Sequence, residues 1–405
     1  MFVRVIFTLF FLAAAGVSAF SPRWSVPTAQ IWQQKVGWKA GANFAPSTAV
    51  NELEMFQADT FDLKTIDREL GFAANLGMGV VRVFLHNLLW TQDAEGFLHR
   101  LESFLDVAHK HHINVMFVLF DSCWLPNPAL GTQPAPIPGV HNSQWVQAPG
   151  YDIINDPAQF DKLESYVRGV VGHFKHDHRV LAWDFWNEPD NSGYSDEQIA
   201  PLLVKVANWV RSADPMQPLT TPVWTNPASA DYTSFQKTQM DNSDVISFHI
   251  YDNAANTQTA INNFLAYNKG RPAICTEYMA RTAGSTFQPH LELFRDANVI
   301  AINWGLVSGE SFALFFLFVS VLLRVFSCIT RRYLPTSRRI LFFIRTKTST
   351  IAGKIQTIYP WQNDPSNPAT EPPAVWFHDI LNADGSAFNA TEVKYIQSIT
   401  RGTKV

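Results

Sequence analysis

The sequence predicts an α/β protein whose single catalytic domain is a closed (β/α)8 TIM barrel. Short apolar runs alternate with longer amphipathic segments from about residue 36 onward, which is the pattern of repeated βα units. Eight such runs occur, and eight is the number of strands in this barrel. The competing doubly wound sheet would need a glycine-rich phosphate-binding loop after its first strand, and residues 37–47 show none.

Each expected strand is a short segment rich in apolar residues, followed by turn residues or polar side chains. In chain order the strands are residues 37–44, 79–85, 114–120, 180–186, 219–225, 245–251, 273–278 and 299–305. Amphipathic segments expected to be helical lie between them, among them residues 65–76, 96–111, 157–173, 195–213 and 260–268. Because the strands of such a barrel are parallel, their carboxyl ends meet at one rim, where a functional site is expected.

The composition supports one large folded domain. Hydrophobic residues make up 47% of the 405 residues and charged residues 16%, so a sizeable core is available. The net charge of −4 gives no support for nucleic acid as a partner. The three cysteines, Cys123, Cys275 and Cys328, cannot form a disulfide framework, and no pair has metal-ligand spacing. We therefore expect free, buried thiols.

The amino terminus has the features of a secretory signal peptide. Arg4 is followed by an apolar stretch over residues 5–15 and by small residues at positions 17–19. We predict that residues 1–19 are removed, that residues 30–405 form the barrel domain, and that the protein is extracellular. The sequon at Asn389 agrees with secretion. We expect a monomer with no stable membrane association.

Polar and aromatic side chains gather at the carboxyl ends of the expected strands. Such a gathering at one rim would be unusual in a purely structural protein. We expect Glu188 and Glu277 to be catalytic and the other eight residues to bind substrate. In chain order the residues are Arg82, His86, Asp121, Trp124, Asn187, Glu188, His249, Tyr251, Glu277 and Trp304.

Glu188 and Glu277 follow the fourth and seventh strands, and two facing carboxyl groups are the arrangement that hydrolyses glycosidic bonds. One carboxyl protonates the leaving oxygen while the other attacks the anomeric carbon, so their environments must differ. We expect Trp183 and Trp186 to make the surroundings of Glu188 less polar, which raises the pKa of its carboxyl group. The amide of Asn187 is suited to bind a sugar 2-hydroxyl group.

Glu277 is expected to stay ionised, because Arg82 and Tyr251 supply a positive charge and a hydrogen bond. Trp304 is expected to form a platform under the bound sugar ring. Arg82 has the alternative of a simple ion pair at the rim, and Tyr251, like His249, has the alternative of rim packing.

Other rim segments allow more than one interpretation. His86 and Asp121 form a possible metal pair, but polar rim groups usually bond to one another, and we expect no metal. Trp124 and Trp145 are either sugar platforms or core residues. Residues 51–54 either reach the cleft or begin a helix, and the helix is favoured. Residues 126–150 form a segment too long for a simple connection and are expected to build a wall of the cleft.

Taken together, the rim residues resemble those of clan A glycoside hydrolases, most closely the family five cellulase and mannanase group. The resemblance extends from about residue 36 to the carboxyl terminus, apart from residues 310–353. The matching positions are Arg82, Asn187-Glu188-Pro189, His249 with Tyr251, Glu277 and Trp304.

This resemblance implies a retaining mechanism with Glu188 as acid/base, Glu277 as nucleophile and no cofactor. It implies a polysaccharide or oligosaccharide substrate from a cell wall: β-mannan, β-glucan or xylan. Asp121 and Trp124 stand where many family five enzymes have a histidine, which leaves the sugar open. The alternative is a non-catalytic carbohydrate-binding barrel, or an enzyme disabled by residues 310–353.

Residues 310–353 break the barrel pattern directly after the eighth strand. Residues 311–323 are uncharged and mostly apolar, which is short of the roughly 20 residues of a membrane span. One acidic residue, Glu310, stands against seven basic ones: Arg324, Arg331, Arg332, Arg338, Arg339, Arg345 and Lys347. Codons for Gly309-Glu310-Ser311 and Ala352-Gly353 can contain splice-donor and splice-acceptor sequences. We therefore interpret the segment as a translated intron; a genuine insertion loop and a membrane segment are the alternatives.

Overall fold

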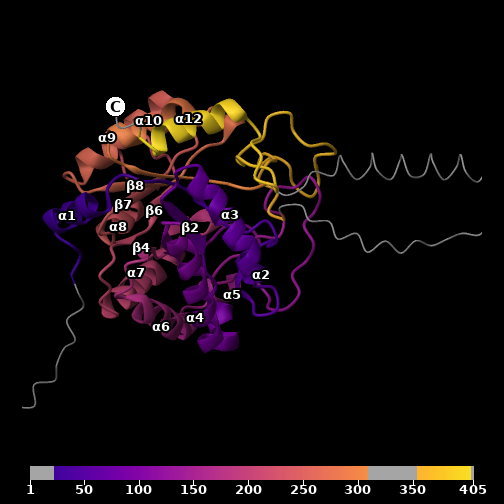
Figure 1. Cartoon of the computed structure of the whole chain (residues 1–405). Helices are drawn as coiled ribbons and strands as arrows, with labels where there is room; N and C mark the ends of the chain where they lie inside the picture. Colours follow the sequence, from indigo (N-terminus) through magenta and orange to yellow (C-terminus); the bar gives the residue numbers. More distant parts are fainter. Residues whose placement is uncertain (1–21, 309–353, 403–405) are drawn as a thin grey trace, which may run out of the picture.

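The structure, a computed structural model, describes residues 22–308 and 354–402, and it confirms the expected barrel (Figure 1). The strand segments of these residues form one parallel sheet in the order β5-β4-β3-β2-β1-β9-β8-β7-β6. They are β1 (Ala40–Asn43), β2 (Val80–Phe84), β3 (Asn114–Val118), β4 (Val180–Asp184), β5 (Leu219–Thr220), β6 (Pro222–Val223), β7 (Ile246–His249), β8 (Ala273–Glu277) and β9 (Ile300–Asn303).

The fifth barrel position is divided between β5 and β6, which are the two ends of the sheet order. Leu219 of β5 lies opposite Trp183 of β4, and Val223 of β6 lies opposite Phe248 of β7. Only one residue separates the two segments, and Pro222 lacks the N–H group that continued pairing would use. The single strand expected over residues 219–225 therefore changes partner halfway and closes the barrel through the chain itself.

Helices surround the sheet and follow the strands in alternation (Figure 1). They are α1 (Val26–Val36), α2 (Glu52–Phe56), α3 (Leu63–Asn75), α4 (Asn87–Lys110), α5 (Tyr151–Ile154), η1 (Pro157–Leu163), α6 (Glu164–Phe174), η2 (Asn191–Gly193), α7 (Asp196–Ser212), α8 (Ser234–Asp241), α9 (Ala254–Tyr267), η3 (Arg281–Ala283), α10 (Phe287–Asp296) and α12 (Ala390–Thr400). None of the helices in the described ranges is both long and apolar enough to cross a membrane.

Helix beginnings follow local side-chain chemistry. Ser195 accepts a hydrogen bond from the backbone of Gln198, whose side chain in turn accepts one from the Ser195 N–H, so a capping box starts α7. Asn51 caps α2 by accepting from the N–H of Glu54, which confirms the helix interpretation of residues 51–54.

The apolar core has two main layers. Outward-facing strand residues pack against the helices in a large cluster. Inward-facing residues at the amino-terminal ends of the strands, such as Val80 and Met116, form a smaller cluster that α1 covers with Ala29 and Trp32. Arg271 donates to the carbonyl of Trp24, so the packed domain begins before residue 30, the boundary expected from the sequence.

Two long loops join above the carboxyl-terminal rim. One follows β3 and contains residues 126–150; the other follows residue 354 and leads to α12. The N–H of Asn142 donates to the carbonyl of Ile355 at 2.9 Å, and the N–H of Gly139 donates to the side chain of Gln356 at 3.0 Å. Because these contacts join segments more than two hundred positions apart, the loops form one continuous wall.

Residues 1–19 and 310–353, the expected signal peptide and the atypical segment, lie outside the described residues. The chain on either side of 310–353 is packed on the rim. The N–H of Ser308 donates to the carbonyl of Leu381 at 2.7 Å, and the N–H of Lys354 donates to the carbonyl of Ser47 at 3.2 Å. The flanking residues are therefore integral to the barrel.

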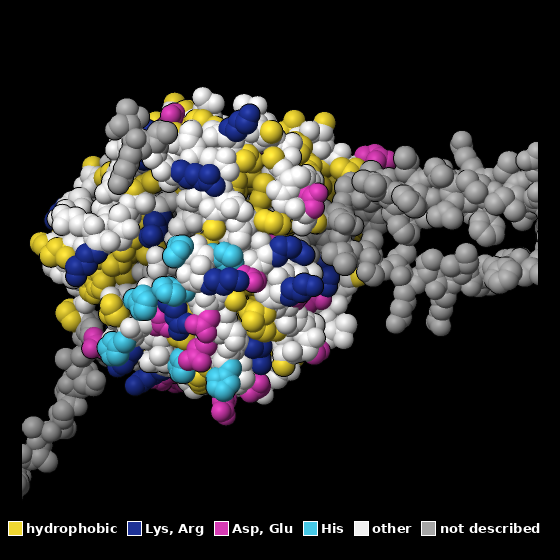
Figure 2. Space-filling model, in the orientation of Figure 1, with side chains coloured by type: hydrophobic (Ala, Val, Ile, Leu, Met, Phe, Trp, Pro, Cys, Tyr) yellow, Lys and Arg dark blue, Asp and Glu magenta, His cyan; other side chains and the backbone are white. Residues whose placement is uncertain are grey.

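One face of the molecule carries many histidines among acidic and basic side chains, over the region where Figure 1 places α4 and α6 (Figure 2). Two histidines at the ends of α4 and α6 lie against carboxyl groups. His173 Nε2 is 2.9 Å from Oε1 of Glu102, and His111 Nε2 is 2.6 Å from Oδ1 of Asp67. The face is thus a mixed surface rather than a patch of one charge.

Glu52, in the first turn of α2, is a buried carboxyl group that the fold tolerates at a cost. It is 1% exposed, and neither of its oxygens has a hydrogen-bond partner among the described residues. Burial, with a smaller contribution from the charge of Asp121, raises the pKa of Glu52 well above its usual value. The folded protein therefore holds this proton at a pH at which the unfolded chain releases it.

Glu52→Gln is expected to remove this proton linkage. Below the ordinary carboxyl pKa, Glu52 is neutral in both the folded and the unfolded state, and the protein has its full stability. As the pH rises toward the raised pKa, the unfolded chain releases the proton while the folded protein keeps it, so the free energy of unfolding falls. The free energy of unfolding, measured with denaturant between pH 5 and 8, should fall less steeply in the variant, by up to about 1.4 kcal/mol per pH unit. The exposed Glu95→Gln serves as control. Equal slopes for wild type and Glu52→Gln would contradict the assignment.

Candidate active site

A cavity of about 490 Å³ opens among the carboxyl ends of the strands. Both expected catalytic carboxyl groups, Glu188 and Glu277, contribute to its wall, so the structure brings them together as the sequence predicted. The lining residues are Asp121, Cys123, Trp124, His141, Asn142, Trp145, Glu188, Asn191, Ser192, Trp224, Tyr251, Glu277, Trp304 and Trp361. The cavity is therefore walled by aromatic rings around a few polar groups, as small-molecule sites usually are.

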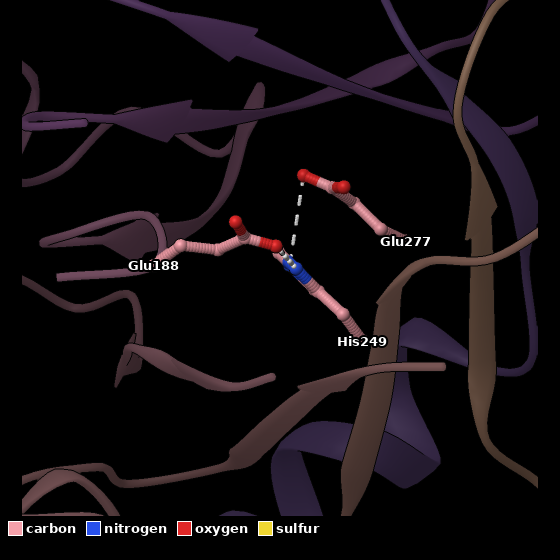
Figure 3. Close-up of side chains that lie close together, drawn as sticks. All are labelled: Glu188, His249 and Glu277. Carbon is pink, nitrogen blue, oxygen red and sulfur yellow. Dashed lines mark hydrogen bonds and ion pairs between the residues drawn. The ribbon is translucent and has the colours of Figure 1, made fainter. Parts of the chain in front are cut away.

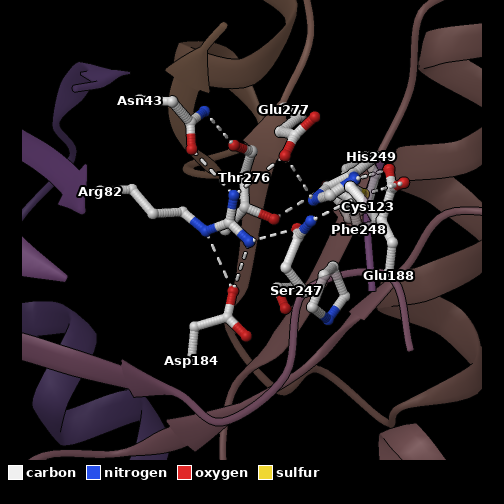
Figure 4. A network of polar contacts seen from close by, with 12 residues as sticks. Asn43, Arg82, Cys123, Asp184, Glu188, Ser247, Phe248, His249, Thr276 and Glu277 are labelled. Atoms are coloured by element: carbon white, nitrogen blue, oxygen red, sulfur yellow. Dashed lines mark hydrogen bonds and ion pairs between the residues drawn. The ribbon is translucent and has the colours of Figure 1, made fainter. Parts of the chain in front are cut away.

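Glu277, at the end of β8, is held by Arg82 on one oxygen (Figure 4) and by Tyr251 on the other. Arg82 Nη1 donates to its Oε1 at 3.0 Å, and the hydroxyl of Tyr251 donates to its Oε2 at 2.7 Å. Both contacts were expected from the sequence. They fix the carboxyl plane and favour the ionised form.

Arg82 lies inside the barrel under Glu277 and is completely buried. Its guanidinium contacts Asp184 Oδ2 through Nε at 3.0 Å and Nη2 at 2.7 Å, and it also donates to the side-chain oxygens of Asn43 and Asn187 at 2.8 and 2.6 Å. All the polar contacts of Arg82 in the structure are internal, and its contact with substrate stays a prediction. Its role is to position and charge-balance Glu277.

Glu188 follows β4 and has a backbone φ of 40°, in the left-handed region that side chains other than glycine rarely adopt. Such strain persists where the surrounding structure fixes it, and it is common at functional sites. His249 Nδ1 lies 2.7 Å from Oε1 of Glu188, and the amide of Asn191 donates to Oε2 at 2.5 Å. The carboxyl group is thus tied to β7 on one side and to η2 on the other.

Trp183 and Trp186 do not wall Glu188, contrary to expectation. Trp183 stacks on Phe117 and donates to Gln217; Trp186 packs on Phe120 and donates to Ser122. Both rings belong to the core between sheet and helices. Trp183 faces outward because it alternates with Asp184, which contacts Arg82 inside the barrel; Trp186 lies beyond the end of β4, where strand alternation does not set its direction.

His249 lies between the two glutamates (Figure 3). Its Nδ1 contacts Glu188, and its Nε2 lies 3.6 Å from Oε1 of Glu277. Burial lowers the pKa of His249 to about 3, so the ring is neutral and carries one proton. His249 is 2% exposed and does not line the cavity, and its contact with substrate stays a prediction.

Two proton arrangements satisfy the contact between Glu188 and His249. If Nδ1–H donates to an ionised Glu188, the bare Nε2 faces the negative Oε1 of Glu277. If a protonated Glu188 donates to Nδ1, Nε2–H faces that oxygen instead. The second arrangement places a positive hydrogen toward the carboxylate, so we assign the proton to Glu188 and the charge to Glu277.

Burial raises the pKa of both catalytic carboxyl groups. At Glu277 the charge of Glu188 adds to the rise, while His249, Arg82 and the Tyr251 hydrogen bond oppose it. The expected contacts therefore restrain the pKa of Glu277 but do not bring it below its usual value. Of the two glutamates, only Glu277 contacts a guanidinium, and this contact favours its ionised form.

Aromatic rings form much of the remaining wall. Trp304 packs edge-on against Phe84 and Trp145, and it lines the cavity as the expected platform would. Trp124 is 40% exposed and also lines the cavity. Trp145 is packed in a cluster, as the core alternative predicted, and it also borders the cavity; its role as a sugar platform stays a prediction.

Asp121 and His86 organise the loop after β3. Asp121 Oδ2 accepts from Trp145 Nε1 at 2.7 Å, and its Oδ1 accepts from the amide of Asn187 at 2.9 Å. His86 is fully buried; its Nε2 contacts the carbonyl of Gln147 at 3.0 Å, and its Nδ1 accepts from a backbone N–H. Both ring nitrogens of His86 are used within the protein, and its contact with substrate stays a prediction.

Asn187 is 2% exposed, and its amide contacts Arg82 and Asp121. It lies beside the cavity wall rather than in it, and its contact with a sugar hydroxyl stays a prediction. Among the described residues, Glu188, His249 and Glu277 also have metal-ligand atoms within 4.8 Å of one another. Their direct contacts, and the guanidinium on Glu277, already account for this closeness as a hydrogen-bond network.

The sequence interpretation missed several cavity residues. Trp224 follows the fifth strand, where the strand-end rule would have found it, and its indole N–H donates to Asp190 at 2.7 Å. Trp361 packs edge-on against Tyr251 from the loop after residue 354, and no local pattern indicates this. Cys123 contacts Glu188 through a tertiary approach between neighbouring loops, whereas Asn191 follows Glu188 by only three residues.

Comparison with known proteins agrees with this geometry. Residues 49–311 match the model of the cellulase family, glycosyl hydrolase family 5. GH5_18 from Streptomyces cattleya in complex with GlcNAc is 14% identical, with 91% of this chain and 81% of that chain covered and a TM-score of 0.54. The endo-beta-1,4-mannanase from Thermotoga petrophila is 13% identical, with 91% and 77% covered and a TM-score of 0.52. These two likenesses show the fold.

No curated protein matches the sequence. The family model covers well over half of the chain and includes both glutamates, and the protein belongs to glycosyl hydrolase family 5, the cellulase family.

Proposed function

We propose that the protein is a secreted, retaining β-glycoside hydrolase that cleaves a cell-wall polysaccharide by double displacement. The observation that carries the proposal is the closeness of the two carboxyl groups, which have oxygens within 4.8 Å of each other at one cavity. Retaining enzymes place their carboxyl groups about 5–5.5 Å apart, whereas inverting enzymes leave about 6.5–9.5 Å for a water molecule.

In the first step Glu277 attacks the anomeric carbon and forms an ester bond to the sugar, while the bond to the leaving oxygen breaks. Glu188 gives its proton to that oxygen. Tyr251 and Arg82 hold the attacking carboxylate in place and balance its charge before attack. In the resting site this proton is bound to Glu188 and hydrogen-bonded to Nδ1 of His249.

In the second step Glu188, now ionised, takes a proton from water. The water oxygen attacks the anomeric carbon, the ester bond to Glu277 breaks, and Glu277 leaves as a carboxylate. Asn191 stabilises the ionised Glu188 through its hydrogen bond to Oε2. The two glutamates thus end in their starting protonation states.

The wall of the cavity supports a sugar substrate, because tryptophan rings offer flat apolar faces beside polar groups. β-Mannan is the first substrate to test, since one similar structure is an endo-beta-1,4-mannanase. β-Glucan and xylan complete the panel. Secretion is supported by the amino-terminal sequence and by the exposed position of Asn389 in the sequon.

Glu188→Gln and Glu277→Gln are each expected to lower turnover of the cleaved polysaccharide by several orders of magnitude, because each removes one of the two essential groups. An aryl glycoside with a dinitrophenyl leaving group needs no proton, so Glu188→Gln should still release the phenol in a first burst, whereas Glu277→Gln should not. Reducing-sugar and stopped-flow assays measure these effects.

The exposed Glu197→Gln is the matched control and should keep wild-type turnover. Near-normal turnover in either active-site variant would refute the assigned roles. Proton NMR of the first product anomer separately tests retention of configuration, and an inverted anomer would exclude double displacement.

Removal of residues 310–353 is expected to leave a folded, active barrel, because the residues on both sides are already seated on the rim. The shortened chain and the full chain are expressed side by side and compared for solubility, melting temperature and hydrolysis. The full chain should be the less soluble, since it carries an apolar run over residues 311–323. A shortened chain that does not fold would show that the segment belongs to the domain.

A further inference from the structure

Oε2 of Glu188 is held by two donors that no motif in the sequence indicated. Asn191 Nδ2 donates to it at 2.5 Å, and Cys123 Sγ donates to it at 3.3 Å. These contacts leave Oε1 to His249. Oε1 of Glu188 therefore carries the proton that is exchanged, and Oε2 has its own pair of hydrogen-bond donors.

The thiol of Cys123 is also the acceptor for two side-chain amides. Asn187 Nδ2 and Asn191 Nδ2 each lie 3.4 Å from Sγ. The N–H of Cys123 donates to Asp121 at 3.0 Å, which fixes the residue in the loop after β3. The sulfur thus connects this loop to the segment after β4, on which Glu188 lies.

The thiol remains protonated in this setting. Burial raises the pKa of Cys123 well above its usual value, and the nearby carboxyl groups of Asp121, Glu188 and Glu277 add to the rise. Cys123 is therefore a hydrogen-bond donor rather than a reactive thiolate.

We propose that Cys123 and Asn191 are positioning residues that hold Oε2 of Glu188 and balance its acid and base forms through one weak and one strong hydrogen bond. This inference rests on the proposed function. A thiol is a weak donor, so it orients the carboxyl group while stabilising the ionised form only slightly. A hydroxyl group at the same place would stabilise the ionised form more, and an apolar side chain would not stabilise it at all.

The other titratable groups around Glu188 are common to the wild type and the variants. They are Arg82 from β2, Asp121 from the loop after β3, Asp190 from the segment after β4, His249 and Tyr251 from β7 and the residues after it, and Glu277 from β8. A change confined to position 123 therefore reports the donor itself.

The test is the pH dependence of kcat/KM for Cys123→Ala, Cys123→Ser and Asn191→Ala, on whichever of β-mannan, β-glucan and xylan the wild type cleaves fastest. Activity falls at high pH as free-enzyme Glu188 loses its proton. Cys123→Ala and Asn191→Ala should move this alkaline limb upward, the latter by roughly half a pH unit or more, and Cys123→Ser should move it downward.

Cys275→Ser is the matched control, since this buried thiol contacts the backbone carbonyl of Glu277 and not Glu188; its alkaline limb should stay in place. A dinitrophenyl glycoside gives a second readout: its phenol release should change little in the position-123 variants. An unmoved alkaline limb in Cys123→Ala and Cys123→Ser, with an active wild type, would overturn this inference alone. A wild type without any hydrolysis would instead overturn the proposed function.

Discussion

The buried guanidinium of Arg82 is the constraint on which the rest of the site depends. A positive charge without solvent access is stable only when acceptors surround it, and here Asp184, Glu277, Asn43 and Asn187 do so. These partners come from three barrel positions, at or just after β1, β4 and β8, so the ion pair fixes the strands relative to one another and sets the direction in which Glu277 points. Nucleophile geometry and barrel register are therefore consequences of one network (Figure 4).

The same network separates the roles of the two glutamates. Both are buried, and burial alone would make them alike. Of the two glutamates, Arg82 contacts only Glu277. Neutral His249 lies between them, with one ring nitrogen toward each carboxyl group. The asymmetry of charge thus favours the proton on Glu188 and the negative charge on Glu277.

The cavity wall depends on contacts between parts of the chain that lie far apart in sequence. Trp145 is held by Asp121, and its loop is held by the backbone around Ile355. Trp361 comes from the same late segment and packs on Tyr251, which itself binds Glu277. The cavity wall and Glu277 are consequently connected through Tyr251. This coupling explains why the segment that begins at Lys354 must be seated correctly for the site to be complete.

The sequence by itself determined the barrel, the rim and the pair Glu188 and Glu277, because strand periodicity and parallel topology place every strand end at the same edge. It also indicated the contacts of Glu277 with Arg82 and Tyr251. Only the tertiary structure decided which rim side chains face the cavity: His86 turns inward to backbone groups, whereas Trp361 and Cys123 reach the wall. The physical reason is that local patterns specify the direction of a strand, while loop conformation and hydrogen bonds between distant segments specify the direction of each side chain.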